Sequence, residues 1–217
     1  MSDCCSPKGY RWVFSERRAN AEAKRYRRRG LDRTSRRIVE LIAHQQVQVD
    51  GSTLLEVGGG VGAIQIDLLR AGAARAVNVE LTPTYEHASL QLLSESGLEG
   101  RVERRLMDFA ESADQVDAAD IVIMNRVVCC YPDMPRLAGA AAAHARTVLL
   151  LSFPKRTWWT RVALGLGNIA LRLTRREFHI FLHKPAEIFA TAERAGLNLA
   201  LVRPGLFWTV AALQRAS

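Results

Sequence analysis

The sequence predicts a doubly wound α/β fold with a mostly parallel sheet of seven strands. Three observations support this. The apolar run 53–57 ends directly in glycines, as a buried parallel strand does before its crossover helix. Strand-like runs then alternate with helical stretches of about ten to fifteen residues, which is typical of a parallel sheet. Two closing strand-like runs flank Pro204-Gly205, so they are expected to pair with each other.

Two basic helices are expected before the first strand. They lie within residues 10–43 and are interrupted at Gly30, and Asp32 or Ser35 can cap the second one. The dipeptide 50–51, Asp-Gly, is a turn signal and ends this region. We therefore expect a basic N-terminal helical extension over residues 1–50, which would act as a cap.

Proline and glycine set the limits of the elements that follow. Pro83 and Pro185 suit the first turn of a helix, and Gly97 and Gly196 suit the end of one. The main domain is expected over 51–217, with a helical cap insertion at about 155–184. Strands are predicted at about 53–57, 76–80, 102–106, 121–124, 148–152, 199–202 and 207–213, and helices at about 63–71, 83–96, 134–145 and 185–194.

Composition narrows the class of protein. The chain has 217 residues, of which 48% are hydrophobic and 24% charged, as in a globular domain. It has no run of eighteen apolar residues, so no spanning helix is expected. Residues 1–30 are polar and basic and do not resemble an export signal, so the expected location is cytoplasmic.

The net charge of +8 is unevenly distributed. Residues 1–50 and 155–184 each carry a net charge of +6, and the rest of the chain carries −4. These charges are either solvated helix faces or a basic cap over an anionic small molecule, a nucleic acid or a membrane surface. In the membrane alternative, Trp158 and Trp159 would be interfacial anchors.

The glycine turn after the first strand fits two classes of ligand. The spacing Gly58-x-Gly60-x-x-Ala63, with Glu80 twenty residues past Gly60, fits the dinucleotide fingerprint. The same stretch also has the form acidic-x-Gly-x-Gly-x-Gly from Glu56. That form resembles the first motif of class I methyltransferases, which bind S-adenosylmethionine. The turn alone does not distinguish these two ligands.

The ends of the later strands favour the methyltransferase resemblance. An acidic residue follows the second strand, where that family holds the ribose, and an acidic-aromatic pair follows the third, beside the adenine. Residues 125–127 follow the fourth strand, where the family contacts the methionine part of the cofactor. The cofactor-binding residues that the resemblance implies are Glu56, Gly58, Gly60, Gly62, Glu80, Leu81, Asp108, Phe109 and Arg126.

Three further features resemble the magnesium-protoporphyrin IX O-methyltransferases. They are Tyr131-Pro132, the run 151–158 (Leu-Ser-Phe-Pro-Lys-Arg-Thr-Trp) and His183. The chain differs from that family at Gly59, usually Cys, and over its first fifty residues. The resemblance implies methylation of a small or medium anionic acceptor at oxygen, with Tyr131, His179 and His183 as catalytic candidates and Trp158, Arg175 and Arg176 as acceptor-binding candidates.

Other functions remain open at this point. An RNA methyltransferase would fit the basic charge, but the Asn/Asp-Pro-Pro-Tyr/Phe motif of base N-methylation is absent from 125–133. Cys129 and Cys130 could serve a thiol or metalloid methyltransferase together with 4–5, although no Cys-x-x-Cys or zinc spacing occurs and no metal is expected. A non-catalytic binding module is the third alternative. For the cap, the competing interpretation is a helix whose aromatic residues simply pack on the sheet.

Overall fold

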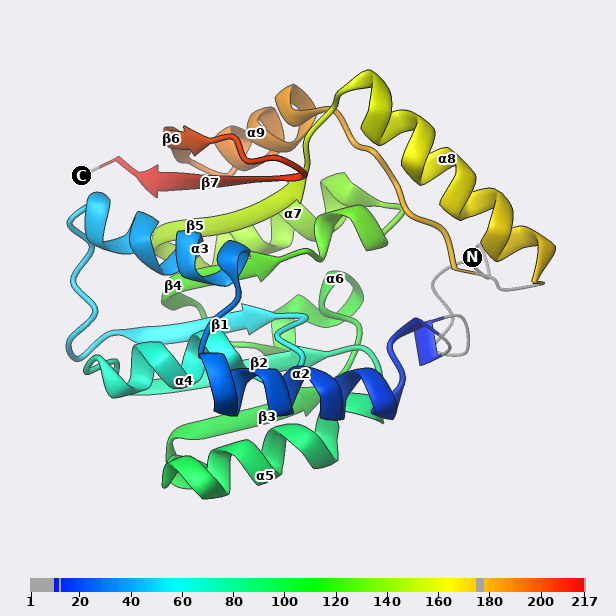
Figure 1. Cartoon of the computed structure of the whole chain (residues 1–217). Helices are drawn as coiled ribbons and strands as arrows, with labels where there is room; N and C mark the ends of the chain where they lie inside the picture. The colour runs from blue at the N-terminus through cyan, green and yellow to red at the C-terminus, as the bar shows by residue number, and fades with distance from the viewer. Residues whose placement is uncertain (1–9, 12, 175–177, 217) are drawn as a thin grey trace.

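Figure 1 shows a computed structural model of the chain, in which one central sheet carries helices on both faces. The structure describes residues 10–11, 13–174 and 178–216. Its seven strands lie in the order β3-β2-β1-β4-β5-β7-β6, and β7 runs antiparallel to both of its neighbours while the other pairings are parallel. The predicted fold class is confirmed. The strands are β1 (Thr53–Val57), β2 (Arg75–Glu80), β3 (Val102–Leu106), β4 (Ala119–Asn125), β5 (Ala145–Pro154), β6 (Leu197–Arg203) and β7 (Trp208–Arg215).

The strand register brings the functional strand ends together. β1 is buried on both faces, with Leu54 and Leu55 almost inaccessible, which explains its uninterrupted apolar sequence. Val57 at the end of β1 lies opposite Val79 of β2, and Glu80 lies opposite Leu106 of β3. The segments that leave β1, β2, β3 and β4 therefore start along one edge of the sheet.

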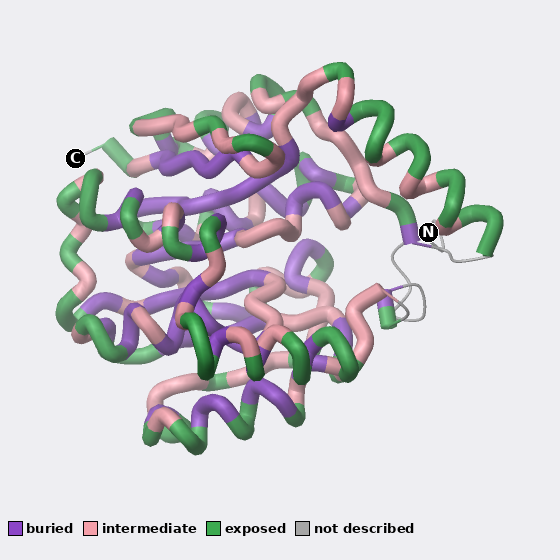
Figure 2. Tube along the Cα trace, in the orientation of Figure 1, coloured by how far each residue is buried: buried purple, intermediate pink, exposed green. Residues whose placement is uncertain are grey.

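Two helical layers cover the sheet. One core cluster joins one face to α2, α3, α4 and α5, and the other joins the opposite face to α6, α7 and α9. Figure 2 shows the sheet as the buried centre between these layers. The helices are α2 (Glu16–Arg29), α3 (Arg33–His44), α4 (Ala63–Arg70), α5 (Glu86–Ser96), α6 (Phe109–Ser112), α7 (Met134–His144), α8 (Trp158–Leu173) and α9 (Pro185–Arg194), with short 3-10 turns η2 (Pro83–Tyr85), η3 (Glu99–Arg101), η4 (Ala113–Gln115) and η5 (Val128–Cys130).

The second N-terminal helix, α3, begins at a capping residue and packs into the core. Asp32 caps α3 by accepting hydrogen bonds from the backbone of Thr34 and Ser35 at 2.7 and 3.0 Å. Ile38 and Leu41 of α3 are fully buried in the core, so α3 is part of one helical layer. One core cluster includes residues on both sides of residue 50. The division of the chain into a cap over 1–50 and a main domain over 51–217 stays a prediction.

The cap insertion contains one long helix, α8, which stands away from the sheet (Figure 1). A capping box between Thr157 and Thr160 starts it, and Thr160 is its one buried residue. Trp158, Val162 and Leu166 are 77%, 54% and 62% exposed. The interpretation that the helix packs on the sheet through these three residues is therefore wrong. Of the other two residues in that interpretation, Trp159 is half-buried with its ring centroid 5.9 Å from that of Phe207, and Leu164 is half-buried. α7 and α9 already cover that face of the sheet.

No helix in the described ranges combines the length and the apolar character needed to cross a bilayer.

Candidate functional site

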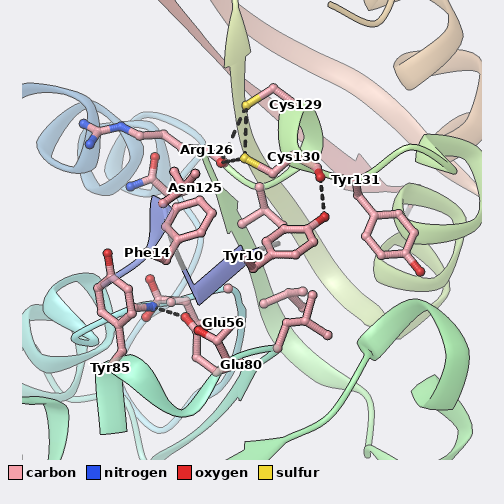
Figure 3. Close-up of a pocket in the computed structure, with 18 of the residues that line it drawn as sticks. Tyr10, Phe14, Glu56, Glu80, Tyr85, Asn125, Arg126, Cys129, Cys130 and Tyr131 are labelled. Carbon is pink, nitrogen blue, oxygen red and sulfur yellow. Dashed lines mark hydrogen bonds between the residues drawn. The ribbon is translucent and has the colours of Figure 1, made fainter. Parts of the chain in front are cut away.

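A cavity of about 340 Å³ lies at the edge of the sheet where β1, β2, β3 and β4 end. Figure 3 shows part of its lining. The strand ends and the glycine turn form its floor, while Tyr10, Val13 and Phe14 of the N-terminal segment, α2 and the cap segment form its other walls. Lining residues from these two parts include Gly58, Gly60, Glu80, Leu81, Asp108, Phe109, Arg126 and Tyr131 on the one side, and Tyr10, Val13, Phe14, Arg18, Glu22, Leu164, Phe178 and Ile180 on the other.

The glycine turn has no space for side chains. Gly58 and Gly60 have φ angles of +65° and +58°, which disfavour other residues. A Cβ at Gly58 would lie 2.6 Å from Cγ2 of Val127, and one at Gly60 would lie 3.2 Å from the Tyr85 ring. Gly62, also left-handed, is the N-cap of α4 and is not among the cavity's lining residues. The turn thus leaves its backbone open to the cavity and starts α4 there.

Glu80 ends β2 with its carboxylate in the cavity. Its Oε1 accepts a hydrogen bond from the backbone N–H of Gly60, which ties β2 to the glycine turn. Burial raises the pKa of Glu80 to about 7, and the hydrogen bond from Gly60 and the charge of Arg104 oppose that shift. The side chain is therefore positioned as an acceptor for hydroxyl groups of a ligand.

Glu56 lies beneath the same turn. Only 2% of it is exposed, and a Cβ at Gly59 would lie 2.8 Å from its Cδ. Burial raises the pKa of Glu56 to about 8, with a further contribution from the charge of Glu80. Its Oε2 has no hydrogen-bond partner within the described part of the chain. Behind it, the side chains of Asn78 and Gln65 are hydrogen-bonded to each other at 3.2 Å.

Glu22 on α2 was not predicted as a site residue. A Cβ on Gly60 would lie 3.9 Å from its Oε1, so its carboxyl group lies beside the glycine turn. Burial raises its pKa, and the charges of Arg126 and Arg18 act in the opposite direction. The sequence contains a signal for this residue. Glu22 lies on the same helix face as the buried Ala19, Ala23 and Tyr26, and charged residues are rare on buried faces unless they are paired.

Asp108 has two structural partners as well as a position in the cavity. Its Oδ1 accepts from the backbone N–H of Ala110 at 3.0 Å and so caps α6. The hydroxyl of Tyr131 donates to its two oxygens at 3.1 and 3.2 Å. Phe109 is 3% exposed and packs edge-on against His144, with 5.4 Å between ring centroids. The predicted catalytic Tyr131 and the predicted adenine-binding Asp108 are therefore neighbours.

Arg126 connects the end of β4 to the N-terminal helices. Its φ of +63° is unusual for a residue with a side chain. Its Nη2 lies 2.6 Å from Oδ1 of Asp32, and its guanidinium lies 5.5 Å from the ring centroid of Trp208. Next to it, the Asn125 side chain donates to Ser35 Oγ at 3.0 Å. Residues 32–35 and 125–126 thus form one polar network at the cavity wall.

An aromatic cluster closes the cavity on the side of the N-terminal segment, and we call it the aromatic roof. It consists of Tyr10, Phe14 and Phe178, whose ring centroids lie 5.4–6.0 Å apart. The hydroxyl of Tyr10 donates to the backbone oxygen of Cys130, as Figure 3 shows. The roof was not predicted as a unit, because Phe178 and Cys130 lie more than a hundred positions from Tyr10 in the sequence.

Several predicted residues lie away from the cavity. His183 Nε2 lies 3.0 Å from the backbone oxygen of Tyr131, and His179 Nε2 lies 3.2 Å from Asn168 Nδ2. Neither histidine lines the cavity, and neither does the exposed Trp158. Arg175 and Arg176 lie outside the described residues. The roles predicted for these five residues remain predictions.

The adjacent cysteines do line the cavity. Cys129 and Cys130 are free thiols with their sulfur atoms 3.7 Å apart. The hydrogen bond between them, together with burial, holds the pKa of Cys130 well above its ordinary value. Among the described residues, no group of three or more His, Cys, Asp or Glu side chains is arranged to hold a metal ion.

A family model described as a methyltransferase domain matches residues 19–202 of this chain. Among curated relatives, the ribosomal protein L11 methyltransferase of Salmonella arizonae is 33% identical over 81 residues, which are 36% of this chain and 26% of that protein. The same protein of Edwardsiella ictaluri is 35% identical over 89 residues. The chain matches only about a quarter of the length of these relatives.

Solved structures share the fold at low identity. Magnesium protoporphyrin IX methyltransferase from Synechocystis, with S-adenosylhomocysteine bound, has a TM-score of 0.65 and 19% identity, covering 84% of this chain and 83% of the other. An O-methyltransferase family protein from Burkholderia thailandensis has a TM-score of 0.69 and 22% identity, covering 95% of this chain and 62% of the other.

Proposed function

This chain belongs to the methyltransferase-domain family and is a class I, S-adenosylmethionine-dependent methyltransferase domain, and we propose that it methylates an oxygen atom of a small acceptor that has an apolar ring system and a negative charge. The observation that carries the proposal is the aromatic roof. It faces the glycine turn across one cavity, so a ring-containing acceptor could lie beside the cofactor. The cytoplasmic location expected from the sequence is part of this proposal.

The residues at the cavity floor fit the cofactor. The glycine turn leaves backbone exposed where added side chains would collide with Val127 and Tyr85. The carboxyl groups of Glu22, Glu56 and Glu80 surround the turn, and a ligand with a positive sulfonium and ribose hydroxyls to donate would favour their ionised forms. Glu80 would hold the ribose hydroxyls. When bound, S-adenosylmethionine supplies an electrophilic methyl group.

The part of the cavity beside the aromatic roof suits an apolar acceptor with a charged group. Tyr10, Phe14 and Phe178 provide aromatic faces and edges for stacking. Arg18, whose guanidinium lies 5.5 Å from the Phe14 ring centroid, lines the same space and would attract an anion. The O-methyltransferase family protein among the structural neighbours lends support to oxygen as the acceptor atom.

Methyl transfer depends mainly on the orientation of the acceptor. A carboxylate acceptor is ionised near neutral pH and is a nucleophile without a base, whereas a hydroxyl acceptor needs a group that takes its proton. For a hydroxyl, the Tyr131–Asp108 pair is the candidate in the cavity. His183, which contacts the backbone of Tyr131, would then position that pair. In both cases stacking on the aromatic roof would orient the acceptor beside the cofactor.

The test compares acids with matched neutral analogues. Purified protein and cofactor labelled in the methyl group are incubated with aromatic carboxylic acids, their amides and hydroxylated analogues. Transfer to acids that mild base reverses, releasing labelled methanol, indicates a methyl ester and supports the proposal, and base-stable transfer to hydroxylated analogues supports a phenolic oxygen. Label found on nitrogen, sulfur or carbon contradicts it. Gly60→Asp is the control that should lack transfer to every acceptor.

A second candidate acceptor is a ribosomal component. The curated relatives are methyltransferases of ribosomal protein L11, and α2 ends in three consecutive arginines, Arg27, Arg28 and Arg29. Methyl transfer to ribosomal protein or RNA with a steep dependence on salt would favour this alternative. A thiol or metalloid chemistry at Cys129 and Cys130 has less support, because the raised pKa of Cys130 keeps its thiol protonated.

A further inference from the structure

One face of α8 presents large apolar side chains to solvent, and we call this face the α8 stripe. Trp158, Val162, Leu166, Ile169 and Leu173 are 77%, 54%, 62%, 56% and 79% exposed. They follow one another at spacings of four, four, three and four residues, so they lie along one side of the helix. Figure 2 shows α8 as a mostly exposed helix at the outside of the molecule. Such a continuous apolar face marks a contact surface.

The rest of the structure holds the stripe outward. The Asn168 side chain accepts from the backbone N–H of Ile180 and donates to its backbone oxygen, both at 2.9 Å. Leu164, on the inner side of the same helix, lines the cavity. The inner side of α8 therefore already contacts the rest of the protein. A further movement of the helix toward the cavity would not cover the stripe.

The charges around α8 identify the partner. The helix contains Arg161 and Arg172, both exposed, and no acidic residue. Lys155 and Arg156 precede it, and residues 155–184 as a whole hold seven basic and one acidic side chain. A second copy of this chain, docked through the same stripe, would bring like charges together. An anionic surface is complementary to both the stripe and the charges.

We propose that the α8 stripe binds the surface of a bilayer that contains anionic phospholipids. Amphipathic helices with basic polar faces lie in the headgroup region in this way, and Trp158 at one end is of the type enriched there. At sixteen residues, α8 is only about 24 Å long and partly polar, so it would lie along the bilayer. The bilayer would then adjoin the cavity wall that contains Leu164. This proposal does not depend on the identity of the methyl acceptor.

The test uses the full chain and sedimentation with vesicles. One set of vesicles contains equal parts of phosphatidylglycerol and phosphatidylcholine, and the other contains phosphatidylcholine alone. Leu166→Glu on the stripe is compared with Leu90→Glu on α5, which is 49% exposed and serves as the matched control. Arg172→Glu tests the charge contribution. Thermal melting checks that each variant is folded.

The wild-type protein and Leu90→Glu are expected to sediment with the anionic vesicles and much less with the neutral ones. Leu166→Glu should lower the partition coefficient about ten-fold or more, and Arg172→Glu by a smaller factor that disappears at high salt. Absence of wild-type binding, or equal loss in Leu90→Glu and Leu166→Glu, overturns the proposal. So does a wild-type oligomer that Leu166→Glu dissociates, because the stripe would then be an interface between copies.

Discussion

The position of the Glu80 carboxylate can be tested by a substitution that keeps its shape. Glu80→Gln retains one oxygen to accept from the Gly60 N–H but replaces the other oxygen with an amide donor. Above about pH 7, where Glu80 is mostly ionised, at least one hydrogen bond from a ribose hydroxyl to a charged acceptor is lost, worth about 1.5–3 kcal/mol. That free energy corresponds to an increase of about ten- to hundred-fold in the dissociation constant of the cofactor.

Isothermal titration calorimetry with S-adenosylhomocysteine measures this change without turnover. Glu95→Gln on α5 makes the same chemical change at an exposed ion pair with Arg27, away from the cavity, and should leave the dissociation constant unchanged. If Glu80→Gln binds the ligand as tightly as the wild-type protein does, the carboxylate does not contact the ribose. Equal weakening in both variants would indicate a nonspecific effect of lost negative charge.

Three further predictions concern the same site. Gly60→Asp would place a Cβ 3.2 Å from the Tyr85 ring at a φ of +58°. It should abolish the binding of S-adenosylhomocysteine measured by calorimetry while the helical circular dichroism is preserved. Retained binding would contradict the assigned role of the turn. In the folded, ligand-free protein, Glu80 and Glu56 keep their protons up to about pH 7 and 8, whereas in the unfolded chain they lose them near pH 4.5. The melting temperature of the protein should therefore fall as pH rises from about 5 to 8. A melting temperature that is flat or rising over that range, or a slope that Glu56→Gln leaves unchanged, would refute this. Asp32→Ala removes the cap of α3 and the partner of Arg126 and should cost about 1–2 kcal/mol in chemical unfolding, and an unchanged midpoint would show that neither contact matters.

The sequence predicts the strands and the cavity floor well because both depend on local patterns. Each strand is a short apolar run between turn signals, and parallel strands bring their carboxyl ends to one edge. Residues that directly follow those strands, such as Glu80, Asp108 and Arg126, were therefore predicted to meet, and they line one cavity. Their roles toward the cofactor are still predictions, which the substitutions above test.

The roof and α8 were not predictable in the same way. Tyr10 reaches the cavity because its segment crosses to Cys130, and no local pattern specifies such a distant contact. In α8, an apolar spacing typical of a helix packed on a core instead faces solvent, since periodicity shows that one face is apolar but not what covers it. Glu22 was missed because its basic neighbours suggested a solvated helix.

The position of β7 has a consequence for the order in which the chain folds during synthesis. β7 is made after β6 but lies between β5 and β6, so β6 has no neighbour in the sheet until β7 has left the ribosome. Val210 and Ala211 of β7 enter opposite core layers, and α3 packs against the same strand. Because α3 is synthesised early and β7 late, the packing of α3 cannot be completed until β7 has been synthesised. A chain that ends at Arg203 should lose its near-ultraviolet circular dichroism and aggregate, although five of its six remaining strands could still pair.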